Sequence, residues 1–378
     1  MSYFIDMDTF SFIHISDLHI GKKLNGYDLH EDQKYVLEKI VDIVRKRKPD
    51  AVLIAGDVYD RTNPSEDAIA LLNDFLVKLQ ATGSEVFVIG GNHDPGEKLS
   101  FLSNIVDGSG LHIVGKFSGK LEKRSIGNVD IYLLPYIRTC DVRRYFPDSP
   151  IESTSDALRV VLDSAPLDKD KINVLVAHQA VLGALSSGSE DSIIGGESPV
   201  PSSLFSDFDY VALGHIHRCQ PVGCANIRYP GSMLKYSIDD AKEKFALYGK
   251  ILDDGELEME EIKLESIHDV VVLRGSFSSI VSGGSSDDYV AVVLTDETDV
   301  PDALPSLMGK FPRLLSMVYD NARTRTTSDI VFVGDDENER TPGEYFGELF
   351  EMIARKKIGK SQLDVLEDAI KEIWGGDV

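Results

Sequence analysis

Five short apolar runs between residues 12 and 217 each end in residue types that bind metal ions, and no other feature limits the fold as strongly. The runs have the length and the β-branched content of buried strands. The clusters that follow them are Asp17-Leu18-His19, Gly56-Asp57, Gly91-Asn92-His93-Asp94, His178 and Gly214-His215-Ile216-His217. Because the carboxyl ends of strands in a sheet lie along one edge, the sequence predicts that these clusters meet in space.

Helical patterns alternate with these runs, which is typical of a layered α/β domain. Apolar residues recur at helical spacing over 36–44 and over 69–79, the second time after the helix-start signal Pro64-Ser65. We therefore expect an α/β fold over residues 1–265, a layered sandwich of mixed sheets flanked by helices.

The remainder of the chain predicts smaller additions, as expected for 378 residues, which exceed the usual size of one core. The strand pattern restarts over residues 266–322 and indicates a small α+β domain. Residues 323–342 are polar and acidic, which is typical of a linker. Residues 343–378 carry two amphipathic helical patterns, whose apolar faces need a surface to cover them.

The charge balance bears on the partners of the chain. Its 39 Lys and Arg against 63 Asp and Glu give a net charge of −24, whereas phosphate binding usually shows as an excess of cations. Carboxylates that bind cations contribute to this sum, and a partner subunit can supply the grip on an anionic substrate. The three cysteines form no CxxC pair, and neither a membrane-spanning run nor a secretory signal is seen, so we expect a cytoplasmic protein.

The donor types in the five clusters predict a reaction. Imidazole, carboxylate and amide oxygen without thiolate favour cations such as Mn²⁺, Fe or Zn²⁺ over a structural zinc site. Two such ions can hold both the attacking and the leaving oxygen of a displacement at phosphorus. The sequence therefore predicts hydrolysis of a phosphate ester.

The five clusters, in this order, resemble the calcineurin-like metallophosphoesterase superfamily. The resemblance implies the metallophosphoesterase sandwich and two divalent ions, with Mn²⁺ expected. It implies that one ion is bound by Asp17, His19, Asp57 and His217, and the other by Asp57, Asn92, His178 and His215. Asp57 would then bridge the two ions.

The same resemblance assigns residues beside the ions. His93 is expected to be a catalytic residue that binds no metal, faces the scissile phosphate and assists the leaving oxygen. Asp60 is expected to orient His93, and Arg61 to touch the phosphate. The alternatives are that Asp60 is an ordinary turn carboxylate and that Arg61 is a solvated surface charge.

Flanking segments narrow the resemblance to the bacterial SbcD family, the nuclease subunits of SbcCD exonuclease complexes. The similar segments are residues 13–21, 80–83, 209–218, 227–232 and 235–237. The resemblance covers about residues 10–265 and implies manganese-dependent cleavage of DNA phosphodiesters at duplex ends, hairpins and single strands. Such activity serves DNA repair, recombination and replication.

The partners are also implied by this resemblance. The helices of 343–378 are expected to bind an SbcC-like coiled-coil ATPase, the domain of 266–322 to cap DNA, and two copies of the chain to pair in a heterotetramer. Docking of these helices on their own parent domain is the alternative. Two other functions remain open: a phosphomonoesterase or phosphoprotein phosphatase, which the Asp60-Arg61 pair favours, and a scaffold whose metals only stabilise the fold.

Overall fold

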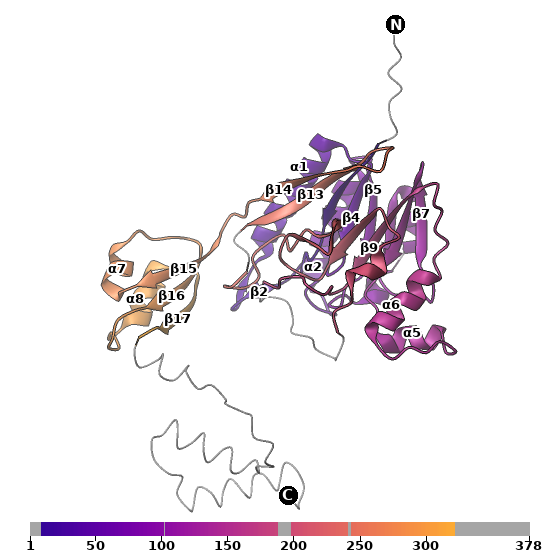
Figure 1. Cartoon of the computed structure of the whole chain (residues 1–378). Helices are drawn as coiled ribbons and strands as arrows, with labels where there is room; N and C mark the ends of the chain where they lie inside the picture. The colour runs from indigo at the N-terminus through magenta and orange to yellow at the C-terminus, as the bar shows by residue number, and fades with distance from the viewer. Residues whose placement is uncertain (1–8, 102, 188–197, 241–242, 322–378) are drawn as a thin grey trace, which may run out of the picture. The chain divides into compact units, whose positions relative to one another are not determined.

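A computed structural model describes residues 9–101, 103–187, 198–240 and 243–321 (Figure 1). The chain divides into two compact units. The larger unit holds the chain up to Val272 together with Ser285–Ala291 and Phe311–Leu315, and the smaller unit holds the rest. The predicted linker of 323–342 and the predicted C-terminal helices of 343–378 lie outside the described residues.

Two six-stranded mixed sheets form the centre of the larger unit. The first has the order β14-β13-β1-β4-β5-β6, in which β1, β4, β5 and β6 run parallel and β13 and β14 antiparallel. Its strands are β1 (Phe10–Ile15), β4 (Ala51–Ala55), β5 (Glu85–Ile89), β6 (Leu111–Val114), β13 (Lys244–Ile251) and β14 (Leu257–Leu264).

The second sheet has the order β11-β12-β10-β9-β8-β7, with a parallel centre and antiparallel edges at β7 and β11. Its strands are β7 (Glu122–Ile126), β8 (Val129–Leu134), β9 (Ile172–His178), β10 (Tyr210–Gly214), β11 (Gln220–Val222) and β12 (Cys224–Tyr229). Apolar side chains of both sheets share one buried cluster, which includes Phe12, Leu53, Phe87, Ile131, Val174 and Tyr210. The two sheets therefore pack face to face.

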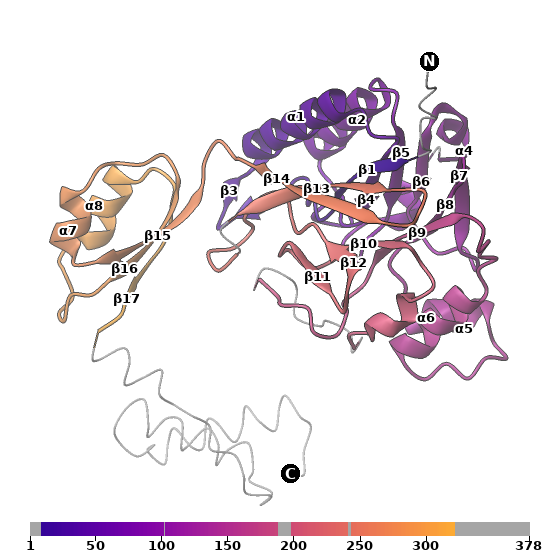
Figure 2. The same ribbon diagram turned by 45° about the horizontal axis from the view of Figure 1, so that its top comes forward.

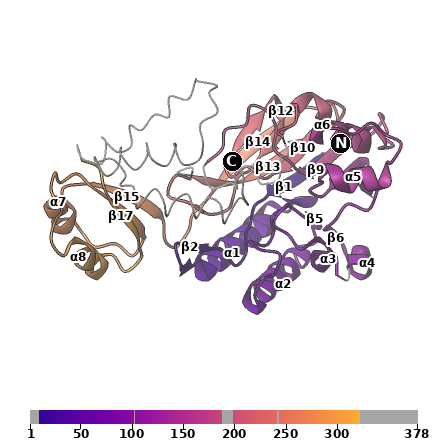
Figure 3. The same cartoon turned by 90° about the horizontal axis from the view of Figure 1, so that it is seen from below.

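Helices cover the outer faces of both sheets. Figure 2 shows α1 (His30–Arg47) and α2 (Glu66–Gln80) on one side and α5 (Thr139–Tyr145) and α6 (Thr154–Asp163) on the other, and Figure 3 shows α1 and α2 opposite α6. The ends of these helices follow from sequence: the Ser65 side chain caps α2, and Ser153 begins α6 with a capping box. The predicted sandwich of mixed sheets flanked by helices is confirmed.

Short elements complete the larger unit: β2 (Lys23–Leu24), β3 (Tyr27–Asp28), α3 (Gly96–Leu99), α4 (Ser103–Val106), η1 (Asp107–Ser109) and η2 (Ser202–Phe205). Residues 266–321 have the predicted α+β character, a three-stranded sheet with two helices. Its elements are β15 (Val270–Gly275), α7 (Phe277–Ser282), β16 (Tyr289–Leu294), α8 (Ala303–Lys310) and β17 (Leu314–Tyr319). Within the described ranges, no helix has the length and apolar character needed to cross a bilayer.

Candidate metal centre

The loops that follow β1, β4, β5, β9 and β10 bring the predicted ligands together. His19 Nε2 lies 3.1 Å from His217 Nε2, and Asp17 Oδ1 lies 3.9 Å from the same His217 atom. All three side chains are buried. They form one of three groups whose ligand atoms all lie within 4.8 Å of one another.

The protonation of this first group suits a cation. Burial lowers the pKa of His19 to about 3 and holds the pKa of His217 well below its usual value, so both imidazoles are neutral. Two neutral ring nitrogens that face each other leave at least one lone pair directed into the group. The other ring nitrogen of His19, Nδ1, is buried without a hydrogen-bond partner. The residues therefore fit a divalent ion.

Three further predicted ligands, Asn92, His178 and His215, form a second group. The Asn92 Oδ1 atom is 3.0 Å from His178 Nε2 and 3.1 Å from His215 Nδ1. His178 Nδ1 donates to the carbonyl oxygen of Ala55 at 2.8 Å, which turns Nε2 toward Asn92 and fixes the ring as in many metal sites. Burial lowers the pKa of His178, but the charge of Asp57 outweighs it and raises this pKa to about 9. A bound cation would have to displace that proton.

Asp57 joins the two groups. Its Oδ2 atom lies 3.3 Å from His178 Nε2, 3.8 Å from His19 Nε2 and 3.9 Å from His93 Nε2. Burial raises the pKa of Asp57, but the neighbouring imidazoles, His178 first among them, bring it well below its usual value. Asp57 is therefore an ionised carboxylate that three imidazoles face within 3.9 Å.

Several ligand residues have strained backbone. The φ angles of Asp17, His19, Asp57 and His215 are 52°, 42°, 48° and 104°, a region that costs side-chain-bearing residues about 1–3 kcal/mol each. Bonds between the loops hold this conformation, such as that from the His19 N–H to the Asp57 carbonyl oxygen at 2.9 Å. A Cβ at Gly91 would clash with the Asp57 carboxylate, so glycine is needed there. Such clustered strain is typical of functional sites.

His93 lies beside both groups and is more accessible than the five buried ligands, Asp17, His19, Asp57, His178 and His217. Its side chain is 20% exposed, and its backbone N–H donates to Asp57 Oδ1 at 2.9 Å. Its Nδ1 lies 3.0 Å from the backbone carbonyl oxygen of Asp60, to which it must donate because a carbonyl can only accept. This contact between Asp60 and His93 uses the main chain of Asp60, so the orienting role of the Asp60 side chain stays a prediction.

The carboxylate of Asp60 has its own partners. Lys22 Nζ donates to Asp60 Oδ1 at 2.8 Å, and His19 Nδ1 lies 3.8 Å from the same oxygen. Arg61 is 79% exposed, with Nε 3.4 Å from Asp60 Oδ2. The Arg61 side chain can thus reach outward from the rim of the centre.

Asp94 is a residue whose role the sequence did not predict. Its buried carboxylate accepts three backbone hydrogen bonds, from Gly91 N at 2.8 Å, Val58 N at 3.0 Å and Tyr59 N at 2.8 Å. Asp94 therefore fastens the loop that carries Asp57 to the loop that carries Asn92 and His93. The only signal was its place at the end of the third cluster.

Replacement of Asp94 by alanine should lower the free energy of unfolding by about 3 kcal/mol, because three buried donors lose their acceptor. Urea unfolding followed by circular dichroism measures the change. The matched control is Asp163→Ala, which removes an exposed carboxylate at the end of α6 and should change stability by less than about 0.5 kcal/mol. Equal losses in the two variants would contradict the fastening role.

Other buried polar side chains hold the ligand loops through main-chain atoms. Gln33 Nε2 donates to the His19 carbonyl oxygen at 2.7 Å, and Lys244 Nζ donates to the His217 carbonyl oxygen at 3.0 Å. The Tyr236 hydroxyl donates to the Leu18 carbonyl oxygen, and its ring centroid lies 5.3 Å from that of His19. No sequence pattern identifies such contacts.

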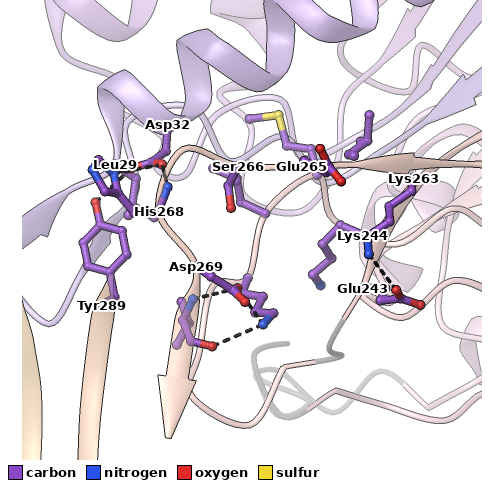
Figure 4. Close-up of a pocket in the computed structure, with 15 residues that line it drawn as sticks. Leu29, Asp32, Glu243, Lys244, Lys263, Glu265, Ser266, His268, Asp269 and Tyr289 are labelled. Carbon is purple, nitrogen blue, oxygen red and sulfur yellow. Dashed lines mark hydrogen bonds and ion pairs between the residues drawn. The ribbon is translucent and has the colours of Figure 1, made fainter. Parts of the chain in front are cut away.

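A cavity of about 220 Å³ lies elsewhere in the larger unit, with Lys244 in its wall (Figure 4). Within it the Asp32 carboxylate accepts hydrogen bonds from the His268 N–H at 2.9 Å and the Tyr289 hydroxyl at 3.0 Å. None of the predicted metal ligands is among the residues that line it. A second cavity of about 450 Å³ is lined by Asp60 and Arg61, but by none of the predicted metal ligands.

Imidazoles and carboxylates gathered at the strand ends of a two-sheet sandwich define a candidate metal-dependent hydrolase. The family model described as calcineurin-like phosphoesterase matches residues 10–219, more than half of the chain. The chain therefore belongs to the calcineurin-like phosphoesterase family. Family membership is one indication of divalent metal ions. The other is the presence of three groups of His and Asp side chains whose ligand atoms lie within 4.8 Å of one another.

Solved structures of similar proteins were also found. A dimetal phosphatase from Danio rerio matches with 14% sequence identity and a TM-score of 0.40, over 68% of this chain and 98% of its own. The protein TT1561 of Thermus thermophilus matches with 10% identity and a TM-score of 0.37, over 67% of this chain and 99% of its own.

Proposed function

We propose that this phosphoesterase is a DNA nuclease that hydrolyses phosphodiester bonds at duplex ends, hairpins and single strands, as the SbcD-like subunit of a repair, recombination and replication complex. The observation that carries the proposal is the gathering of all seven predicted ligands, Asp57 among them, in two connected groups with His93 at the rim. The choice of DNA rests on the segments 13–21 and 209–218, which resemble SbcD and surround this centre.

In our proposal the ligands are divided between two ions as the resemblance implies. One ion would be held by Asp17, His19, Asp57 and His217, and the other by Asp57, Asn92, His178 and His215; we propose Mn²⁺ for both. Such ions supply Lewis-acid chemistry, since they neutralise charge on a phosphoryl group and lower the pKa of water.

The part of His93 follows from its contacts. The Asp60 carbonyl oxygen keeps one proton at Nδ1 and fixes the plane of the ring. The other ring nitrogen, Nε2, is the atom nearer the Asp57 carboxylate, on the side of the ligands. In our proposal, His93 in its protonated form passes the Nε2 proton to the departing sugar oxygen, which would otherwise leave as an unstable alkoxide.

The cavity of about 450 Å³ reaches the rim of the centre only at Asp60 and Arg61, and in our proposal it takes a part of the substrate away from the scissile phosphate. Its wall carries the side chains of Lys23, His30 and Arg61 together with the carboxylates of Asp28, Asp60 and Asp67. We propose that Arg61, whose side chain is 79% exposed at the rim, contacts a phosphate of the substrate.

The strongest test of substrate class compares two phosphate esters. Manganese-loaded protein should cut hairpin DNA and hydrolyse p-nitrophenyl phosphate at least about tenfold more slowly per site, because a small monoester lacks the neighbouring nucleotides that would contact the rim. Gel analysis of labelled hairpins and release of nitrophenol measure the two rates. Rapid hydrolysis of the monoester with intact hairpins would replace the nuclease by a phosphomonoesterase.

The proposed partner is an SbcC-like coiled-coil ATPase, bound by residues 343–378 in the cytoplasm. The net charge of −24 supports this, because a partner with a cationic surface would supply the grip on DNA that this chain lacks. Co-purification of the full chain should recover the ATPase, and truncation after residue 340 should lose it. An ATPase that remained bound to the truncated chain would contradict this assignment of the tail.

A further inference from the structure

His14 is a fully buried imidazole that takes no part in the proposed chemistry. It lies in β1, which precedes Asp17 and His19, and its side chain crosses from the first sheet to the second. Its Nε2 lies 3.1 Å from the carbonyl oxygen of Leu213, and its Nδ1 lies 2.9 Å from the hydroxyl of Tyr210. Both partners belong to β10, the strand that precedes His215 and His217.

The partners fix the tautomer of this ring. Burial lowers the pKa of His14 to about 3, so the imidazole is neutral and carries one proton. A carbonyl oxygen can only accept, so that proton lies on Nε2 and is donated to Leu213. Nδ1 then accepts from the Tyr210 hydroxyl. Both ring nitrogens of His14 therefore have a hydrogen-bond partner in β10 of the second sheet.

A second imidazole makes the reciprocal bond. His178, the last residue of β9 in the second sheet, donates from Nδ1 to the carbonyl oxygen of Ala55, the last residue of β4 in the first sheet. Because β4 pairs with β1 and β9 pairs with β10, the two bonds lie side by side and run in opposite directions. His178 is itself a proposed ligand, whereas His14 is not.

The first ligand group takes its side chains from both sheets. Asp17 and His19 come from the first sheet and His217 from the second, and His19 and His217 meet at 3.1 Å. Apolar packing between the sheets has no direction and resists sliding only through shape, whereas a buried hydrogen bond specifies one register.

We propose that His14 is a positioning residue: its bond to Leu213, two residues before His215, sets the β10 ligands against the β1 ligands. The inference rests on the proposed metal ligands, and does not depend on which phosphate ester is the substrate. Loss of this bond should weaken binding of one ion of the pair by about tenfold, the lower end of the effect of outer-shell changes on metal affinity.

Three variants of the full chain test the proposal. His14→Leu removes both bonds, and His14→Gln keeps an amide N–H that can reach Leu213. Tyr210→Phe is the matched control, since it removes the hydroxyl that bonds Nδ1 and leaves the bond to Leu213. Manganese binding is measured by calorimetry, and electron paramagnetic resonance separates two coupled ions from one isolated ion.

We expect His14→Leu to bind one ion about tenfold more weakly, to show the isolated-ion spectrum at limiting manganese, and to lose kcat with little change in KM. His14→Gln should recover most of the affinity, and Tyr210→Phe should keep the coupled spectrum. Wild-type affinity for both ions in His14→Leu, or an equal loss in Tyr210→Phe, would overturn the positioning role. A wild-type chain that binds two ions but does not cut DNA overturns the nuclease proposal alone.

Discussion

Replacement of His93 by alanine should lower the rate of hairpin cleavage by about 10²- to 10⁴-fold while two ions remain bound, because the proton donor is lost and the ligands are kept. The structure separates these roles: His93 is 20% exposed at the rim, whereas Asp17, His19, Asp57 and His217 are buried. Cleavage of a labelled hairpin under single-turnover conditions, with metal analysis of the same sample, measures both quantities.

The matched control for this variant is His112→Ala. His112 is another partly accessible histidine with fixed ring nitrogens. Its Nε2 lies 2.8 Å from a Glu85 oxygen and its Nδ1 lies 2.7 Å from an Asp107 oxygen, but it lies in β6, outside the metal centre. It should cut DNA at the wild-type rate. Normal cleavage by His93→Ala would remove His93 from the mechanism, and loss of metal from that variant would make it a ligand.

Replacement of Asp57 by asparagine should have the largest effect on the metals. The change keeps the shape of the side chain but removes the negative charge that faces three imidazoles within 3.9 Å. We expect metal content to fall from two ions per chain to below one at micromolar manganese. Loss of several kcal/mol of charge stabilisation corresponds to a decrease in cleavage of about 10³-fold or more.

Asp130→Asn is the matched control for the loss of a buried carboxylate. Asp130 is fully buried and pairs with Lys123 at 2.7 Å and Lys171 at 2.9 Å, apart from the metal centre. It should lose stability and still bind two ions with normal affinity. If Asp57→Asn also retained both ions, Asp57 would not be the bridging ligand, and the division of ligands between the two ions would fail.

The strands and the ligands were predictable because both leave a regular trace in sequence. Runs such as residues 51–55 and 174–177 are apolar throughout, as buried parallel strands are, and their ends meet for geometric reasons alone. The family pattern then distinguished His93 from the ligands. The strands and the meeting of their ends follow from side-chain chemistry and spacing, whereas the separate role of His93 is implied only by the resemblance.

The remaining contacts involve main-chain atoms or distant partners, which have no local signature. Spacing could not indicate that the backbone carbonyl of Asp60 would hold His93, or that the Asp60 carboxylate would pair with Lys22. The bond from His14 to Leu213 joins residues 199 positions apart and depends on how the two sheets stack. Positive φ angles at Asp17 and His19 likewise follow from loop closure, since Asp and His adopt such backbone more often than most residues but still rarely.

The left-handed backbone at Asp17, His19, Asp57 and His215 limits how the protein can be improved by selection. Glycine is the residue that each of these conformations prefers, and glycine offers no ligand atom. A library screened only for resistance to heat should therefore enrich glycine at these four positions and lose the enzyme. A thermostable variant of this chain should therefore keep the residues of these loops, and stabilising substitutions should be made in the helices and on the outer surface.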